Sequence, residues 1–329
     1  MCNQRSYDYV YGPVPSRRMG ISLGIDPVPK FTCTYNCIYC QLGATRNPVS
    51  SSEDIEEGAF PKPSAILTEV KAAVEDYETI DYVTFSGSGE PTLSPFLEEV
   101  REGIREITDL PVALITNSSL LANVETFEMA KGFDLIVPSL DAGDQETFMA
   151  VNRPAGNTEV SEVISALSEL RKCYSEDRFW VEVMLIKSKL LQTNTGEESL
   201  ANLRTALDKV APGIIHLNTC VRPPAEDGVL PLEISELEKI GRKWKEKLKK
   251  NPRVIPVQKS SDSRSLLRNR EKIHDQIIKI LEIRPSRTSD IIDTTGFNPS
   301  EVSKHIQILL EEGEIRRKKT EGEIYYFKD

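Results

Sequence analysis

The chain has 329 residues, of which 39% are hydrophobic, so it can bury a large core and still supply a second, small domain. Its net charge of -10 excludes a global basic field of the kind that attracts polyanions. Three of its six cysteines are clustered and three are scattered, which argues against a disulfide framework. The sequence shows neither an apolar signal region at its start nor a run of roughly 20 apolar residues. We therefore expect a cytoplasmic protein with no membrane partner.

Short apolar runs alternate with amphipathic segments along most of the chain. The apolar runs predict six strands, at 20–28, 81–86, 111–116, 134–140, 179–186 and 213–218. The amphipathic segments predict helices at 63–77, 95–107, 120–131, 158–174, 197–210 and 234–250, with Ser64 as the N-cap of the first. Strands as apolar as these are typical of a parallel sheet that is buried on both faces. With right-handed crossovers the six units predict an α/β fold, a partial or full βα barrel, with its active site at the carboxyl ends of the strands.

A loop with three closely spaced cysteines, Cys33, Cys37 and Cys40, follows the first predicted strand, and Tyr39 precedes the last of them. Thiolates are soft ligands that suit zinc and iron–sulfur clusters. A tetrahedral zinc site needs a fourth ligand nearby, but all three histidines lie far along the sequence. Three thiolates without a fourth ligand favour a cubane cluster with one iron open to a small molecule. The alternatives are three small apolar side chains or a structural zinc site.

Polar residues also stand where the other predicted strands end. The second strand ends in a glycine-rich turn made of Gly87, Ser88, Gly89 and Glu90. Its glycines let the backbone approach a ligand closely, and its carboxylate can accept a hydrogen bond from an ammonium group. Asn117 follows the third strand, where an asparagine could equally cap a helix. Ser139 and Asp141 end the fourth strand on one side, and Asn218 ends the sixth.

A second group of residues has two interpretations each. Glu182 lies inside the fifth strand, where a carboxylate must be paired or must face a cavity, while Trp180 and Met184 on the same face are expected in the core. His216 in the sixth strand is more often a satisfied core histidine than a ligand or an acid. The other candidates, which could bind an anion or line a substrate cavity, are Arg153, Arg222 and Cys220.

The C-x3-C-x2-C spacing, with an aromatic residue before the last cysteine, closely resembles the radical S-adenosylmethionine (SAM) superfamily. The resemblance implies a [4Fe-4S] cluster on Cys33, Cys37 and Cys40, SAM on the fourth iron, and an electron donor such as ferredoxin or flavodoxin. It also implies reductive cleavage of SAM to methionine and a 5'-deoxyadenosyl radical, which abstracts hydrogen from a substrate. The fold that it implies is a six-unit partial barrel.

The same resemblance implies roles for the residues at the strand ends. The turn 87–90 resembles the "GGE" element that binds the amino group of SAM, although Ser88 stands where the family has a glycine. The turn at Asn117 resembles the family's Thr-Asn turn. The remaining residues that we expect to contact SAM are Ser139, Asp141, Asn218 and Tyr39. No residue is assigned a catalytic role of its own.

The segment 11–24, together with 41–43 after the third cysteine, resembles a subgroup of radical SAM proteins related to the tRNA wyosine-synthesis enzyme. This resemblance covers roughly residues 10–225 and implies a tRNA base as substrate. The catalytic lysine of that enzyme is not placed, because Lys30 and Lys187 lie in no matching motif. The adjacent Arg17 and Arg18 could bind phosphate or face solvent.

The sequence predicts three parts: a barrel domain at 1–250, a basic linker at 251–270 and a small domain at 271–329. Helices are predicted at 272–283, 288–296 and 301–312, the last capped by Asn298, followed by a hairpin. This order resembles a winged helix-turn-helix. Acidic residues slightly outnumber basic ones in the small domain, and the segment 316–319 alone offers clustered phosphate contacts. RNA binding, docking of a protein substrate or packing against the barrel is therefore favoured over sequence-specific DNA binding.

The sequence as a whole predicts a radical SAM enzyme, with a tRNA base as the first candidate substrate. A peptide or small metabolite, docked by the winged domain, is the second candidate. A third interpretation, ranked last, is an iron–sulfur regulator that senses redox state and binds DNA. The strand-end motifs argue against it, because a sensor needs no SAM site.

Overall fold

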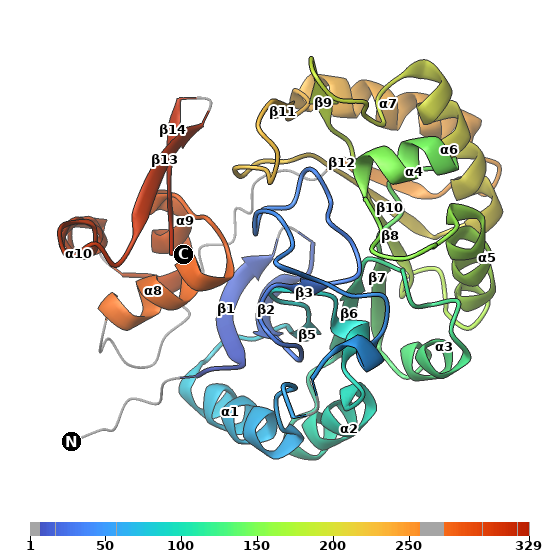
Figure 1. Ribbon diagram of the computed structural model, residues 1–329. Coiled ribbons are helices and arrows are strands. Elements are labelled where there is room, and N and C mark those ends of the chain that lie inside the picture. Colours follow the sequence, from blue (N-terminus) through green and yellow to red (C-terminus); the bar gives the residue numbers. More distant parts are fainter. Residues whose placement is uncertain are drawn as a thin grey trace.

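The computed structural model describes residues 7–16, 18–56, 58–256, 273–297, 299–320 and 322–328. Its centre is a curved layer of eight strands in two hydrogen-bonded sheets (Figure 1). The five-stranded sheet has the order β1 (Val10–Ser16), β2 (Gly20–Ile25), β5 (Tyr82–Phe85), β6 (Val112–Thr116) and β7 (Leu135–Pro138). The three-stranded sheet has the order β12 (Arg253–Pro256), β10 (Ile214–Asn218) and β8 (Trp180–Met184). Bridges from Ile136 to Phe179 and from Ser139 to Glu182 join β7 to β8.

All neighbouring strands of this layer are parallel except β1 and β2, which form an antiparallel hairpin. Seven helices cover its outer side: α1 (Pro63–Asp76), α2 (Leu97–Ile107), α3 (Val124–Ala130), α4 (Gln145–Val151), α5 (Val160–Arg171), α6 (Glu197–Val210) and α7 (Ile234–Lys247). Short elements in the connections are β3 (Thr32–Cys33), β4 (Asn47–Pro48), η1 (Ser52–Asp54), η2 (Pro91–Leu93), β9 (Lys187–Ser188) and β11 (Val229–Leu230). The result is an α/β fold with a parallel sheet, as the alternation of apolar runs predicted.

The six predicted strands are confirmed, each with slightly shorter ends, and α6 has the predicted bounds. Two differences extend the barrel. The N-terminal lead forms β1, and residues expected at the start of the linker form β12, which pairs in parallel with β10. Helix α4 was also not predicted. The prediction of Ser64 as an N-cap is wrong: α1 begins at Pro63, and Lys62 occupies the N-cap position without a side-chain hydrogen bond.

Side chains alternate between the helices and the interior of the barrel along each strand. Outward-facing residues such as Leu23, Leu114 and Val181 are fully buried in the main hydrophobic core. Inside the barrel, the Ser22 and Thr84 hydroxyls are 2.6 Å apart and share a hydrogen bond. The turn between β1 and β2 closes one end of this interior, because its Met19 packs with the inward-facing residues of β6 and β7.

The C-terminal part consists of α8 (Ile273–Ile283), α9 (Thr288–Thr295), α10 (Pro299–Glu311) and an antiparallel hairpin of β13 (Arg316–Thr320) and β14 (Glu323–Phe327). It has a hydrophobic core of its own, and Ser286, between α8 and α9, pairs with Tyr326 of the hairpin. Gly296 ends α9 with a φ of 66°, as its position in the sequence predicted. The predicted cap Asn298 lies outside the described residues, as do Arg17 and the rest of the expected linker.

The C-terminal part contacts the barrel at several points (Figure 1). Helices α8 and α9 pack against β1. Lys30, which precedes the cysteine loop, forms an ion pair with Glu282 of α8 at 3.2 Å. The Tyr325 hydroxyl of the hairpin donates a hydrogen bond to the Val221 carbonyl at 2.5 Å, beyond the end of β10. None of the helices in the described segments is long and apolar enough to cross a membrane.

Candidate active site

The three cysteines lie on the loop that follows β2, and this loop is fixed against the end of α4. The Asn36 backbone N–H donates to the Asn152 carbonyl at 3.1 Å, and that of Ile38 donates to the Val151 carbonyl at 3.0 Å. Tyr35 forms a bridge with Pro154, and the Ile38 side chain is fully buried. The loop is therefore held in place at the barrel mouth by backbone hydrogen bonds and is not a free surface segment.

Two asparagine side chains donate hydrogen bonds to the cysteine sulfurs. The Asn117 amide, at the end of β6, lies 3.5 Å from Sγ of Cys33, and the Asn152 amide lies 3.5 Å from Sγ of Cys37. Burial raises the pKa of the Cys33 thiol to about 12, so this site favours a thiolate only when a cation is bound to it. N–H groups on sulfur are contacts that stabilise electron-rich thiolates and tune a cluster's reduction potential.

This donor set fits a [4Fe-4S] cluster better than a single metal ion. In the part of the chain that the structure describes, no group of three or more His, Cys, Asp or Glu side chains could hold one ion. In a cubane each cysteine binds a different iron, so its ligands need not converge on one point. Three cysteines without a fourth protein ligand therefore suit a cubane. The residues that would hold the cluster are Cys33, Cys37 and Cys40.

The glycine-rich turn after β5 lies against the cysteine loop. A Cβ atom on Gly89 would lie 2.0 Å from the Thr32 carbonyl oxygen, so glycine alone fits there. Gly87 has a φ of 121°, and a Cβ on it would lie 2.5 Å from the Asp26 carboxyl group. Gly89 thus places the turn against the residue before Cys33, and Gly87 places it against the end of β2.

Glu90, at the end of this turn, is buried, and its carboxylate already has protein partners. Oε1 accepts from the Thr92 hydroxyl and the Thr116 hydroxyl, both at 2.6 Å, and from the Thr92 N–H at 3.0 Å. Oε2 accepts from the Asn117 N–H at 2.7 Å. Burial raises the pKa of Glu90, and these hydrogen bonds act in the opposite direction. Glu90 therefore ties the turn to the end of β6 and positions Asn117.

Ser88 has a partner that the sequence did not reveal. Its N–H and hydroxyl both donate to Oδ2 of Asp26, at the end of β2, at 3.1 and 2.6 Å. Burial raises the pKa of Asp26 to about 6. Serine in place of glycine thus couples the turn to β2. Asp26 itself carries no motif signal beyond its place directly after a strand.

Asp141 joins three elements at the mouth. Its Oδ2 accepts hydrogen bonds from the Tyr39 hydroxyl and from the Asn152 amide, the latter at 2.8 Å. Its Oδ1 accepts from the Met184 N–H of β8 at 2.8 Å. Burial raises the pKa of Asp141 to about 6. Asp141 and Tyr39 are thus brought together, and Asn152, which the sequence placed in an undistinguished loop, completes the group.

Two other predicted residues lie deeper in the barrel. The Ser139 carbonyl accepts from the Ser118 hydroxyl at 2.8 Å, and Ser139 pairs with Glu182 across β7 and β8. Asn218 donates to Oε1 of Glu182 at 2.7 Å, and Arg18 forms an ion pair with the same carboxylate. The structure thus links Asn218 to Glu182 on the neighbouring strand rather than directly to the cysteine loop.

The remaining candidates lie in ion pairs or contacts around the rim. Arg153 pairs with Glu226 at 2.5 Å, and Cys220 packs in a cluster with Ile38. The Arg222 guanidinium donates to the Gln41 side chain at 3.1 Å. The two lysines considered for a Schiff base are engaged elsewhere: Lys30 with Glu282, and Lys187 with Glu236 at 2.6 Å.

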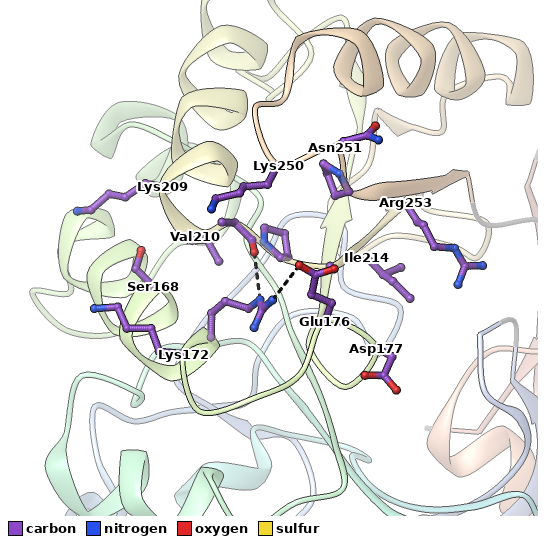
Figure 2. Close-up of a pocket in the computed structure, with 15 residues that line it drawn as sticks. Ser168, Lys172, Glu176, Asp177, Lys209, Val210, Ile214, Lys250, Asn251 and Arg253 are labelled. Carbon is purple, nitrogen blue, oxygen red and sulfur yellow. Dashed lines mark hydrogen bonds and ion pairs between the residues drawn. The ribbon is translucent and has the colours of Figure 1, made fainter.

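A separate hollow of about 490 Å³ lies at the start of β10, opposite to the end that carries Asn218 and beside the carboxyl ends of α5 and α6 (Figure 2). Its basic side chains include Lys172, Lys209, Lys250 and Arg253. Arg171 donates to the Ala211 and Tyr174 carbonyls there. Helix carboxyl ends carry partial negative charge, which basic residues balance, so this hollow has a structural explanation.

Comparison with known proteins places these observations in a family. The model of the Radical SAM superfamily matches residues 28–190. UPF0026 protein MJ1312 of Methanocaldococcus jannaschii is 31% identical over 97% of this chain and 95% of its own length. A Brachyspira hyodysenteriae protein named GTPase Obg is 34% identical over 96% of this chain, but the chain spans only 45% of that protein's length.

Among solved structures, native anSMEcpe with bound AdoMet and Kp18Cys peptide matches with a TM-score of 0.51 and 18% identity. The match covers 71% of this chain and 63% of that one. At this identity the match shows a shared fold. It agrees with the parallel sheet and the flanking helices described above.

Proposed function

The chain belongs to the UPF0026 family and to the radical SAM superfamily, and from this we propose that it cleaves SAM reductively to modify a base of tRNA. As a radical SAM enzyme it has a [4Fe-4S] cluster and SAM as its cofactors. The observation that carries the proposal is the convergence of four strand ends on one loop with three cysteines. Glu90, Asn117 and Asp141 make this convergence through their hydrogen bonds.

The bound cofactors supply a 5'-deoxyadenosyl radical, formed by one-electron cleavage of SAM, that removes a hydrogen atom from the substrate. In this proposal Cys33, Cys37 and Cys40 hold the cluster. The turn 87–90, which the two glycines let lie close to the start of the cysteine loop, receives the amino group of SAM. Further SAM contacts come from Tyr39, Asn117, Ser139, Asp141 and Asn218.

The remaining polar residues hold this arrangement in place. Asn117 and Asn152 donate to sulfur and so favour the thiolate form of Cys33 and Cys37. Glu90 is a positioning residue, since its carboxylate is occupied by the chain's own donors and fixes Asn117. Asp141 positions Tyr39 and Asn152 in addition to its proposed contact with SAM.

The C-terminal part supports RNA as the substrate class. We interpret its order of helices, bridge and hairpin as a winged helix. Strand β13 exposes four consecutive basic residues, Arg316, Arg317, Lys318 and Lys319, which suit phosphate contacts. The hairpin is attached at Val221, beyond the carboxyl end of β10, so RNA bound to it would lie beside the barrel mouth.

The test is anaerobic. The cluster is reconstituted, dithionite and SAM are added, and 5'-deoxyadenosine is quantified with and without bulk tRNA. We expect cleavage in both cases and strong stimulation by tRNA, which an Arg316→Ala, Arg317→Ala, Lys319→Ala variant loses while it keeps the slow basal cleavage. Cleavage that ignores tRNA would contradict the RNA substrate and direct the search to peptides or small metabolites. No cleavage by a cluster-loaded chain would contradict the radical chemistry itself.

A further inference from the structure

The inner face of the barrel is partly exposed at some positions and buried at others, such as Glu182 and His216, which are 8% and 5% exposed. Along β8, the outward-facing Val181 and Val183 are fully buried. The alternate residues Trp180 and Met184, which face the interior, are only partly buried. Ile115 on β6, also inward-facing, is likewise partly buried. We call the barrel interior beside β8 and β10 the chamber.

Charged and polar side chains meet in this chamber. Arg18 enters from the turn between β1 and β2 and pairs with Glu182, and Asn218 donates to the same carboxylate. The Arg18 and Glu182 side chains are 12% and 11% exposed. His216 lies opposite Glu182 in the register of β8 and β10, and its ring centroid is 5.3 Å from that of Trp180.

Three nitrogen atoms of this chamber cluster (Arg18, Glu182, His216 and Asn218) have no hydrogen-bond partner among the described residues. They are Nε of Arg18 and both ring nitrogens of His216. A buried polar atom without a partner is unfavourable, so such atoms indicate a water or a ligand that binds them. Burial, with the charge of Arg18 as the second cause, lowers the pKa of His216 to about 4, so its ring is neutral near pH 7.

The chamber cluster thus offers hydrogen bonds but no net charge. The positive charge of Arg18 is balanced by Glu182, while Nε of Arg18 remains a donor. The neutral imidazole of His216 has one N–H donor and one acceptor nitrogen. A cationic or anionic ligand would have to break the Arg18–Glu182 pair. A neutral group with an acceptor beside a donor matches all three free nitrogens.

We propose that the chamber cluster recognises the substrate through a neutral amide-type edge, in which a hydrogen-bond acceptor stands next to a donor. Carboxamides and the edges of nucleobases share this chemistry. Glu182 lies two residues before Met184, whose N–H binds Asp141, so a group held here lies below Asp141, and Asn218 borders both this group and the proposed SAM site. The inference rests on the proposed function only for what happens to the bound group, not for its recognition.

The test uses three ring compounds of similar size: neutral benzamide, anionic benzoate and cationic benzylammonium. Each is titrated into the cluster-loaded full chain by calorimetry and soaked into its crystals. We expect the wild type to bind benzamide about tenfold more tightly than either ion, with the amide at Arg18 and His216. His216→Phe should lose most of this affinity without a new preference for either ion.

Two charge variants make the test sharper. Glu182→Gln leaves Arg18 unbalanced, so benzoate should become the best ligand by about tenfold. Arg18→Met leaves Glu182 unbalanced, so benzylammonium should become the best. Lys209→Ala, in the hollow at the opposite end of β10, removes a positive charge elsewhere and should change none of these affinities.

The proposal is overturned if the crystals show only water at these nitrogens, or if the order of the three ligands is the same in every variant. Circular dichroism identifies a variant that does not fold. The ligand preferences of the other two variants among His216→Phe, Glu182→Gln and Arg18→Met then decide the test. SAM cleavage plays no part in these measurements. A chain that binds benzamide as expected but does not cleave SAM would uphold this inference and contradict the proposed function. A chain that cleaves SAM but does not bind benzamide would uphold the proposed function and contradict this inference.

Discussion

Ser88 donates two hydrogen bonds to a single oxygen atom, Oδ2 of Asp26: one from its backbone nitrogen at 3.1 Å and one from its hydroxyl at 2.6 Å. The two residues belong to different strand ends, β5 and β2. Their contact binds the glycine-rich turn to the strand that leads into the cysteine loop. It also buries a carboxylate, which has a consequence for stability as a function of pH.

Asp26→Asn should remove one part of the pH dependence of stability. Burial raises the folded-state pKa of Asp26 to about 6, against an ordinary value of 3.8. A raised carboxyl pKa means that the folded chain holds its proton more tightly, so this contribution is full below pH 4 and is lost as the pH rises through 6. It amounts to about 3 kcal/mol in the free energy of unfolding.

The measurement is urea unfolding of the cluster-free wild type and Asp26→Asn chains between pH 4 and 7. The wild type should lose stability relative to the variant over this range, because asparagine can accept the Ser88 bonds without a charge. A difference that stays constant with pH would contradict the assignment.

Asn152→Ala should make the reduction potential of the cluster more negative. The variant loses the N–H donor 3.5 Å from Cys37 Sγ, and such donors stabilise the reduced, more negatively charged state. The potential is followed by a redox titration with electron paramagnetic resonance. Asn123→Ala is the matched control, since Asn123 caps α3 away from the cluster. Equal potentials in all three chains would show that this contact does not act on the cluster.

Cys37→Ala should abolish cluster loading and SAM cleavage, because three thiolates are the whole protein ligand set in this proposal. Iron and sulfide content after anaerobic reconstitution gives the result directly. Cys173→Ala is the matched control, because Cys173 is a free, exposed cysteine in the same chain. A Cys37→Ala chain that loads a full cluster would end the assignment of these ligands.

Gly89→Ala should weaken SAM binding by at least about tenfold. Its Cβ would lie 2.0 Å from the Thr32 carbonyl oxygen, so the turn and the cysteine loop must move apart. Gly196→Ala, where the nearest atom would lie 3.8 Å away, serves as the control. Equilibrium dialysis of SAM with both cluster-loaded variants tests this. Equal affinities would mean that the turn does not contact SAM.

Much of the fold could be predicted from the sequence because buried parallel strands are apolar throughout. Strands such as β6 and β10 therefore stand out as short runs between polar segments. The edge strands do not carry this signal. β1 contains Pro13 and Pro15, which are tolerated because β1 lies at the edge of its sheet, and β12 follows a basic segment that resembles a linker.

The site was predictable where a motif carries it, as in the cysteine loop and the turn 87–90. It was not predictable where single residues act across the barrel. Arg18 reaches Glu182 over a separation of 164 residues, and Asn152 reaches Cys37 over 115. Neither pair has a local spacing that could reveal it, since only the closure of the barrel brings the partners together.

The packing of α8 and α9 on β1 affects how a shortened chain would behave in solution. Within the described residues β1 pairs only with β2, so its other side is an open row of backbone groups. Such an edge promotes association between molecules unless it is covered, and here the two C-terminal helices lie against it. A barrel cut before residue 273 would expose that edge and would tend to aggregate. Inactivity of such a truncated chain would therefore report on solubility and not on whether the C-terminal part binds substrate.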